Sequence, residues 1–344
     1  MDSESPLVSV VIPVFNAEAY IPGCIACLEA QTLADFEVIF VDDGSSDHSH
    51  SLLETAAQND SRFRLISAPH QNAGAARNIG LKAARGKYIS FLDADDSFEP
   101  SLLKEASDLL DHTRADIAVY HFKDLYTDGT FSYRTCYSLD KDSAEDRIFH
   151  SEAFPEQALF FGGASVWNKM YRIELIRKNH VTFDELDAYN DVTFVLRSNL
   201  AAKAIACLDL YLYTYRYNRP LSISAHRGEK YMLMVDVLHS FSSQESCRAP
   251  SLIDIAKAHF LIKTLLMDVG DYRTVQAQNY YTFCQWALRS LHYDRRKVAS
   301  FYPQLNWMVR LFRALSFRLF RFMDSLGLIE LIRRYIHGRK ERKS

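Results

Sequence analysis

The chain has 344 residues, of which 48% are hydrophobic and 24% charged, and this is the composition of a globular protein with a sizeable core. Its length predicts two domains, or one domain with a large extension. The net charge of −3 is unevenly spread, because residues 301–344 carry ten Lys/Arg and three Asp/Glu while the rest is acidic. An acidic body argues against general nucleic-acid binding by the main domain, and the basic tail predicts a surface-seeking C-terminus.

The cysteines and the N-terminus bear on where the protein works. Of six cysteines only Cys24 and Cys27 lie close together, without a second pair to complete a zinc site. We therefore expect reduced thiols, as in a cytoplasmic protein. The start, MDSESPLVSVVIP, lacks the features of a signal peptide, and no stretch reaches the roughly 18 apolar residues that a membrane span needs.

Apolar runs alternate with helical patterns over the first 120 residues. Continuous Val/Ile runs between helices indicate a mainly parallel sheet covered on both faces, which predicts a doubly wound, Rossmann-like α/β domain. Asp47 is the expected N-cap of the second helix, and Gly86 closes the third. The expected strands are Val8–Phe15, Phe36–Asp43, Phe63–Ala68, Lys87–Asp93 and Ala115–Phe122, and the expected helices are Ala17–Gln31, Asp47–Asn59, Ala75–Ala84 and Pro100–His112.

After residue 123 the pattern becomes less regular. The expected elements are a hairpin over Asp124–Leu139, helices over Ser165–Lys178 and Asp191–Asn199, and a strand over Tyr211–Tyr217. Beyond about Lys230 the pattern is mainly helical. We therefore predict a first domain over residues 1–228 and a mostly helical C-terminal region over residues 229–344.

Polar residues collect at the expected strand ends. Asp42 and Asp43 follow the second strand, FLDADD (Phe91–Asp96) ends the fourth, and Pro13–Asn16 ends the first. Ligands of open α/β sheets bind beyond the carboxyl ends of the strands, so these residues are expected to meet. Turn or helix capping would explain any one of them, and we favour it for Asp47, but it does not account for all three ends together.

Such an oxygen cluster suits Mg²⁺ or Mn²⁺, which bridge carboxylates to substrate phosphates. A calcium-binding EF-hand loop starting at Asp93 would need glycine at its sixth position, where Phe98 stands. Walker, HExxH and GxSxG motifs are absent. The sequence therefore predicts a metal–diphosphate site without a glycine-rich phosphate cradle.

Two stretches carry a family resemblance. VSVVIPVFNAEAYIPGCIACLEAQTLADFEVIFVDDGSSDHS and GAARNIGLKAARGKYISFLDADD are similar to the nucleotide-sugar domain of family 2 glycosyltransferases, which have the GT-A fold. The similarity covers about residues 7–125 and continues more weakly, through SVWNKMYRIELI and YRYNRPLSIS, to about residue 225. It implies a nucleotide-sugar half at about 7–125 and an acceptor half at about 126–228. The last third matches no motif.

The resemblance implies roles for the strand-end residues. In such enzymes the acidic pair after the second strand binds base and ribose, and Arg77 would lie near the phosphates, which a guanidinium can hold in a fork. Asp93 and Asp95 match the D-x-D signature: Asp95 is the expected metal ligand, with Asp93 nearer the ribose. Asp96 is a third candidate ligand. The residues placed on the nucleotide sugar are Pro13, Val14, Phe15, Asp42, Asp43, Arg77, Asp93 and Ala94.

Asp191 matches the family's catalytic base, which takes the proton from the acceptor hydroxyl. Inverting members usually carry a Glu-Asp pair at the start of a helix, and here Asn190 stands where Glu is common. A helix N-cap is the alternative role for Asp191. Asn72 stands where many relatives have Gly, so the loop before Arg77 is expected to differ in shape.

Two further groups have open assignments. Trp167, Asn168 and Lys169 resemble a family motif on the acceptor side, where Trp167 either stacks on a sugar or fills the core. A second group either closes over the diphosphate or forms a solvated loop, and it consists of Arg216, Arg219 and His226.

The segment Trp307–Lys343 has helical periodicity, with four arginines on one broad face and Leu, Phe and Met side chains opposite. A basic amphipathic helix with aromatic residues suits the surface of an anionic membrane, which would place the protein at the inner face of the cytoplasmic membrane. The alternative is packing on the catalytic domain or on another subunit.

Together, these features and the resemblance predict a metal-dependent hexosyl- or N-acetylhexosaminyltransferase. It would move a sugar from a nucleoside diphosphate, UDP above all, to a glycan or lipid-linked acceptor of a bacterial surface polysaccharide; inversion is implied by the resemblance alone. A sugar nucleotidyltransferase would need a basic, glycine-rich triphosphate grip, which is absent. A non-catalytic sugar-nucleotide-binding or scaffold protein would not need Asp93, Asp95 and Asp191 together. Whether the protein forms an oligomer is left open.

Overall fold

The computed structural model describes residues 5–136, 148–151, 158–159, 161–217, 237 and 240–241. The chain falls into two compact units, residues 1–225 and 226–344, and nearly all described residues belong to the first. The helices predicted beyond residue 229 therefore lie outside the described residues, except at three positions. The basic segment 307–343, Arg219 and His226 lie wholly outside them, so the predictions for these parts stay predictions.

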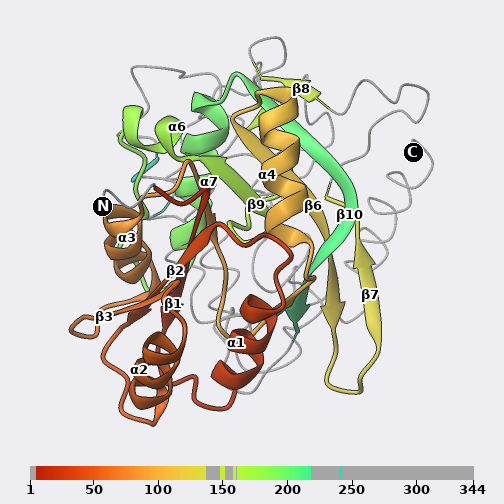
Figure 1. Ribbon diagram of the computed structural model, residues 1–344. Helices are drawn as coiled ribbons and strands as arrows, with labels where there is room; N and C mark the ends of the chain where they lie inside the picture. The colour runs from red at the N-terminus through yellow and green to blue at the C-terminus, as the bar shows by residue number, and fades with distance from the viewer. Residues whose placement is uncertain are drawn as a thin grey trace, which may run out of the picture. The chain divides into compact units, whose positions relative to one another are not determined.

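One sheet organises the first unit (Figure 1). The described strands lie in the order β3-β2-β1-β4-β9-β6-β10-β5, with β7 beside β6 and β8 beside β10. Strands β1 to β4 are mutually parallel. Of these, β1, β2 and β4 are almost wholly buried, which explains their continuous apolar sequences. These strands are β1 (Val8–Val14), β2 (Phe36–Asp42), β3 (Phe63–Ser67) and β4 (Tyr88–Phe91).

Helices cover both faces of this sheet, as the sequence predicted for a doubly wound α/β fold. Alternate residues of β1 point to opposite faces, so Val10 and Ile12 pack with the first group of helices and Val11 with the second. The first group is α1 (Ile21–Glu29), α2 (Ser49–Asn59) and α4 (Leu102–Thr113), and the second is α3 (Ala73–Ala83), α6 (Ile173–Lys178) and α7 (Asn190–Ala201).

The other half of the sheet is mixed in direction. Strand β9 is antiparallel to both of its neighbours, β4 and β6, whereas β10 runs parallel to β6. Strands β6 and β7 form an antiparallel pair, which confirms the predicted hairpin over its described part. These strands are β5 (Ser97–Phe98), β6 (Ile117–Leu125), β7 (Phe131–Arg134), β8 (Ile148–His150), β9 (Lys169–Arg172) and β10 (Ala204–Arg216).

The helix predicted over Ser165–Lys178 is wrong in its first half, because Lys169–Arg172 is strand β9. Met170 and Tyr171 are both fully buried but belong to the cores on opposite faces of the sheet. A short apolar run of this kind is compatible with a buried strand as well as with a helix, so the sequence pattern alone does not distinguish the two. Several boundaries also differ from the predicted ones. Strand β10 begins at Ala204, and α2 begins at Ser49 with His48, not Asp47, at its N-cap position. The Ser49 N–H donates to Asp47 Oδ1 at 2.9 Å.

Candidate active site

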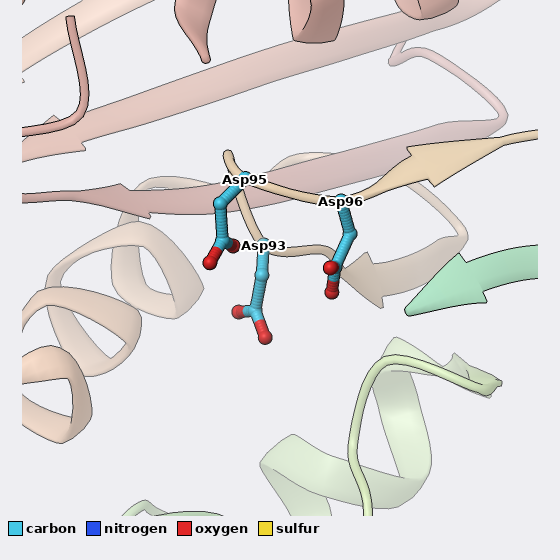
Figure 2. Close-up of side chains that lie close together, drawn as sticks. All are labelled: Asp93, Asp95 and Asp96. Carbon is cyan, nitrogen blue, oxygen red and sulfur yellow. The ribbon is translucent and has the colours of Figure 1, made fainter. Parts of the chain in front are cut away.

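The FLDADD stretch forms a tight acidic turn at the end of β4. Asp93, Asp95 and Asp96 each offer a carboxylate oxygen, and these oxygens lie within 4.8 Å of one another. Figure 2 shows the three side chains projecting from one turn, with their carboxylates on the same side of it. Asp95 and Asp93 are partly exposed, whereas Asp96 is buried. Clustered hard oxygen donors fit Mg²⁺ or Mn²⁺, so the residues present suit the predicted ion.

Asp96 anchors this turn to β10. Its Oδ2 accepts from the Tyr213 hydroxyl at 2.8 Å, and its Oδ1 accepts from the Arg216 N–H at 2.8 Å. Burial, followed by the charges of Asp95 and Asp93, raises the pKa of Asp96 well above its usual value. Because both of its oxygens are engaged by β10, the more accessible ligand candidates are Asp93 and Asp95.

Arg77 of α3 connects the acidic turn to the start of α7. Its Nη2 donates to Asp93 Oδ1 at 2.6 Å, and its Nη1 donates to Asn190 Oδ1 at 2.8 Å. Arg77 is only 7% exposed, so its guanidinium is held between these two partners. Asn190, which stands where the family often has Glu, thus receives a hydrogen bond from a cation without adding a second negative charge.

Asp191 lies in the first turn of α7, which begins at Asn190 after Tyr189. The N-cap position therefore belongs to Tyr189, whose φ of 59° is unusual for a bulky residue, and capping does not explain Asp191. Burial is the main influence and raises the pKa of the Asp191 carboxyl, while Arg77 acts to lower it. A carboxylate with a raised pKa is better suited to accept a proton near neutral pH.

Helix α3 also fixes the segment that leads to Asp191. Asn78 Nδ2 donates to Phe183 O at 3.0 Å, and Phe183 N–H donates to Asn78 Oδ1 at 2.9 Å. A Cβ on Gly74 would lie 2.3 Å from Asp184 O, so only glycine allows this approach. Sequence analysis missed both residues, although they belong to the quoted GAARN stretch.

Asn72, which stands where many relatives have Gly, is the N-cap residue of α3. Its Oδ1 accepts from the Ala75 N–H at 3.0 Å and caps α3, and its φ of −172° is extended backbone that does not require glycine.

The acidic pair after β2 holds the surrounding loops. Asp42 Oδ2 lies 3.0 Å from His50 Nδ1, and Asp43 Oδ2 lies 3.0 Å from His70 Nδ1. The other oxygens accept backbone N–H groups of Ser45 at 3.1 Å and Gln71 at 2.9 Å. Sequence analysis missed both histidines, because they come from α2 and from the loop after β3.

The end of β1 presents one aromatic ring. Phe15 is 46% exposed and stacks on His70, with ring centroids 4.0 Å apart. Val14 is buried, and its carbonyl accepts from the Asp43 N–H at 2.8 Å. Pro13 is partly buried inside the strand, and Ala94 of the acidic turn is buried.

The predicted acceptor-side residues are mostly buried. Trp167 is 8% exposed and stacks on Tyr213 and Tyr215, with centroid distances of 4.6 and 5.5 Å, which favours its core-filling alternative. Asn168 and Lys169 are fully buried and face a turn of their own chain. Arg216 Nε donates to Asp95 O at 3.1 Å, so it stabilises the acidic turn.

Among the described residues, no helix has both the length and the hydropathy of a membrane span.

Comparison with known proteins agrees with this geometry. Residues 9–179 match the model of glycosyl transferase family 2. EpsH of Bacillus subtilis (strain 168), which is named as a glycosyltransferase, is 34% identical over 237 residues, or 66% of this chain and 65% of EpsH. The chain therefore spans slightly less than two thirds of that relative.

Two solved structures share the fold. The structure of S. aureus TarS residues 1–349 with UDP-GlcNAc has a TM-score of 0.69 and 20% identity, covering 96% of this chain and 92% of that one. The mannosyltransferase PcManGT from Pyrobaculum calidifontis, with GDP-Man and Mn²⁺, has a TM-score of 0.53 and 14% identity, covering 97% and 88%. The predicted GT-A fold is confirmed.

Proposed function

Because residues 9–179 form a glycosyl transferase family 2 domain, we propose that this protein transfers a sugar from a nucleoside diphosphate to an acceptor hydroxyl. The observation that carries the proposal is the Arg77 bridge, which joins Asp93 of the acidic turn to Asn190, the neighbour of Asp191. It brings a candidate metal site and a candidate base together at one edge of the sheet. We call the ends of β1, β2 and β4 the donor side, and the starts of β9 and α7 the acceptor side.

The donor side would bind the nucleotide sugar. Asp95 and Asp93 would hold Mg²⁺ or Mn²⁺, which when bound neutralises charge on the diphosphate. Phe15 offers an exposed ring for the base. Asp42 and Asp43 lie at the same edge, where their oxygens accept N–H groups of the neighbouring loops, and these loops would have to adjust for the two carboxylates to bind the nucleotide. The TarS and PcManGT complexes support a nucleotide-sugar donor, and we propose a UDP-sugar carrying a hexosyl or N-acetylhexosaminyl group.

The acceptor side would activate the hydroxyl. Asp191 takes the proton while the hydroxyl oxygen forms its bond to the anomeric carbon. The bond from that carbon to the diphosphate breaks, and its electron pair leaves with the diphosphate. We propose a single displacement, which inverts the anomeric centre, and a bacterial surface glycan as the product.

A donor panel tests the proposed activity. Sugar nucleotides with different bases would be incubated with the full chain and a mixed glycan or lipid-linked acceptor, with Mn²⁺, with Mg²⁺ or with EDTA. We expect binding and acceptor-dependent release of nucleoside diphosphate from at least one UDP-sugar, with release lost in EDTA. Failure of every sugar nucleotide to bind would contradict the proposed function, whereas full release in EDTA would contradict metal dependence alone.

We also propose that the protein works in the cytoplasm, peripherally at the membrane, through the basic segment 307–343. The full chain should then sediment with anionic vesicles and remain free of neutral ones. Equal sedimentation by a chain that ends at residue 300 would contradict this role of the segment.

A further inference from the structure

A lysine with no exposed surface begins strand β9. Lys169 Nζ donates to the carbonyl oxygens of Gly162 at 3.0 Å, Gly163 at 3.0 Å and Ser165 at 2.7 Å, and to Asn168 Oδ1 at 2.9 Å. A buried ammonium is costly unless it is paired or hydrogen-bonded. Within the described residues, four neutral oxygens surround its three protons, so the turn itself provides the solvation.

The backbone is folded closely around this ammonium. Gly162 and Gly163 have φ values of 73° and 75°, a conformation that other residues rarely adopt. A Cβ on Gly162 would lie 2.6 Å from Val119 Cγ1 and 3.3 Å from Lys169 Cε. Without the lysine, the Gly163 and Ser165 carbonyl oxygens would lose this donor, whereas Gly162 O would keep the hydrogen bond from Asn168 Nδ2 at 2.9 Å. A carbonyl oxygen that lost its donor without gaining another would cost free energy.

The direction of β9 places this turn at the active-site edge. Strand β9 is antiparallel to β4, with Met170 opposite Ser90, so its first residue lies where β4 runs out into the acidic turn. Tyr171 packs edge-on against Phe194 of α7, with ring centroids 5.4 Å apart. Because side chains two apart in a strand share a face, Lys169 lies on the face that α7 covers.

Charge links this lysine to the candidate base. Burial raises the pKa of Asp191, Asp93 adds to that effect, and the positive charges of Arg77 and Lys169 oppose it. Burial lowers the pKa of Lys169 to about 7, while Cys136 and Asp191 act in the opposite direction. Tyr171 is the remaining titratable group that interacts with Asp191 from β9.

We infer that Lys169 is a positioning residue of the proposed transfer: its buried ammonium gathers the oxygens of residues 162–168 into a fixed turn and supplies positive charge on the face of the sheet that α7, the helix of Asp191, covers. This inference rests on the proposed function. Because Lys169 is fully buried, it acts through the turn and through the electrostatic environment of the base.

Two variants separate its charge from its hydrogen bonds. Lys169→Met removes both, and Lys169→Gln keeps two N–H donors but no charge. Lys87→Met is the control, because Lys87 is a half-exposed lysine at the opposite end of the neighbouring strand. We expect a loss in kcat of at least about 10-fold in both Lys169 variants, with donor Kd within about threefold of wild type. The acid limb of the kcat–pH profile should move to higher pH, because an opposite charge near a carboxylate is lost.

An acid limb at the wild-type pH in a folded Lys169→Gln protein would overturn the electrostatic role. Hydrogen exchange supplies a readout that does not need activity: amides of residues 161–168 should exchange at least about 10-fold faster in Lys169→Met than in Lys87→Met. Unchanged exchange would overturn the role in the turn. If wild type binds no sugar nucleotide while this exchange difference is present, the proposed function fails and the lysine-centred turn stands.

Discussion

The donor side and the acceptor side balance negative charge in different ways. The donor side crowds Asp93, Asp95 and Asp96 into one turn, where the neighbours and burial raise the pKa of Asp96. At the acceptor side, the described start of α7 carries the carboxylate Asp191, whose pKa the positive charges of Arg77 and Lys169 act to lower. The difference fits the proposed division of work: the donor side would take up a cation together with its substrate, whereas the acceptor side carries its cations in the protein.

The base should show the largest effect, and it tests the acceptor side alone. Replacement of a general base typically lowers kcat by about 100- to 10,000-fold. We therefore expect Asp191→Asn to lose transfer in that range while donor binding, measured by calorimetry, stays within about threefold. Asp108→Asn, at an exposed pair on α4, is the matched control. Normal transfer by the Asp191 variant would show that Asp191 is not the base.

The acidic turn should show the next largest effect, and it tests the donor side. Removal of one group that stabilises the leaving charge costs about 100- to 1,000-fold in kcat. We expect Asp95→Ala to lose metal-supported nucleoside-diphosphate release to that extent, with a higher Mn²⁺ concentration needed for half-maximal rate. Asp108→Ala is the control. A variant with wild-type rate and wild-type Mn²⁺ dependence would show that Asp95 does not hold the ion.

Arg77 couples the two sides, and its loss should have the smallest effect on rate. A misplacement of about 1 Å can cost on the order of 100-fold, so we expect Arg77→Gln to lower kcat by about 10- to 100-fold. Loss of a hydrogen bond to a charged group should lower the free energy of unfolding by about 2 kcal/mol. Denaturant unfolding would measure this change.

Arg77→Lys is the informative companion, because a lysine cannot form the same fork to Asp93 and Asn190. We expect it to recover stability only in part. Full recovery of both rate and stability by lysine would mean that charge alone, without the bridge, is sufficient.

The two sides also differed in how well the sequence predicted them. The donor side consists of local strand–turn–helix units, so the apolar runs before Asp42 and Asp93 were enough to place its carboxylates at one edge. His50 and His70 were missed, because histidines have no characteristic spacing and these two lie on α2 and in the loop after β3, apart from their partners Asp42 and Asp43 at the end of β2.

The acceptor side depends on contacts between distant segments. Arg77 and Asn190 are 113 positions apart, and Asn78 and Phe183 are 105 apart, so no local pattern indicates these bonds. The resemblance identified Asp191 and placed Lys169 in a motif on the acceptor side, but the burial of the Lys169 side chain became evident only once β9 was found to be a strand.

The position of β9 has a consequence for how the chain folds. Strands β4 and β6 are close in sequence, but the strand between them comes from residues 169–172. Until that part of the chain has been synthesised, both strands keep an unpaired edge facing the gap, and such edges promote association between chains. The sheet is therefore expected to remain incomplete during most of the synthesis of the first unit, and a fragment ending near residue 125 should aggregate where a fragment ending near residue 217 folds.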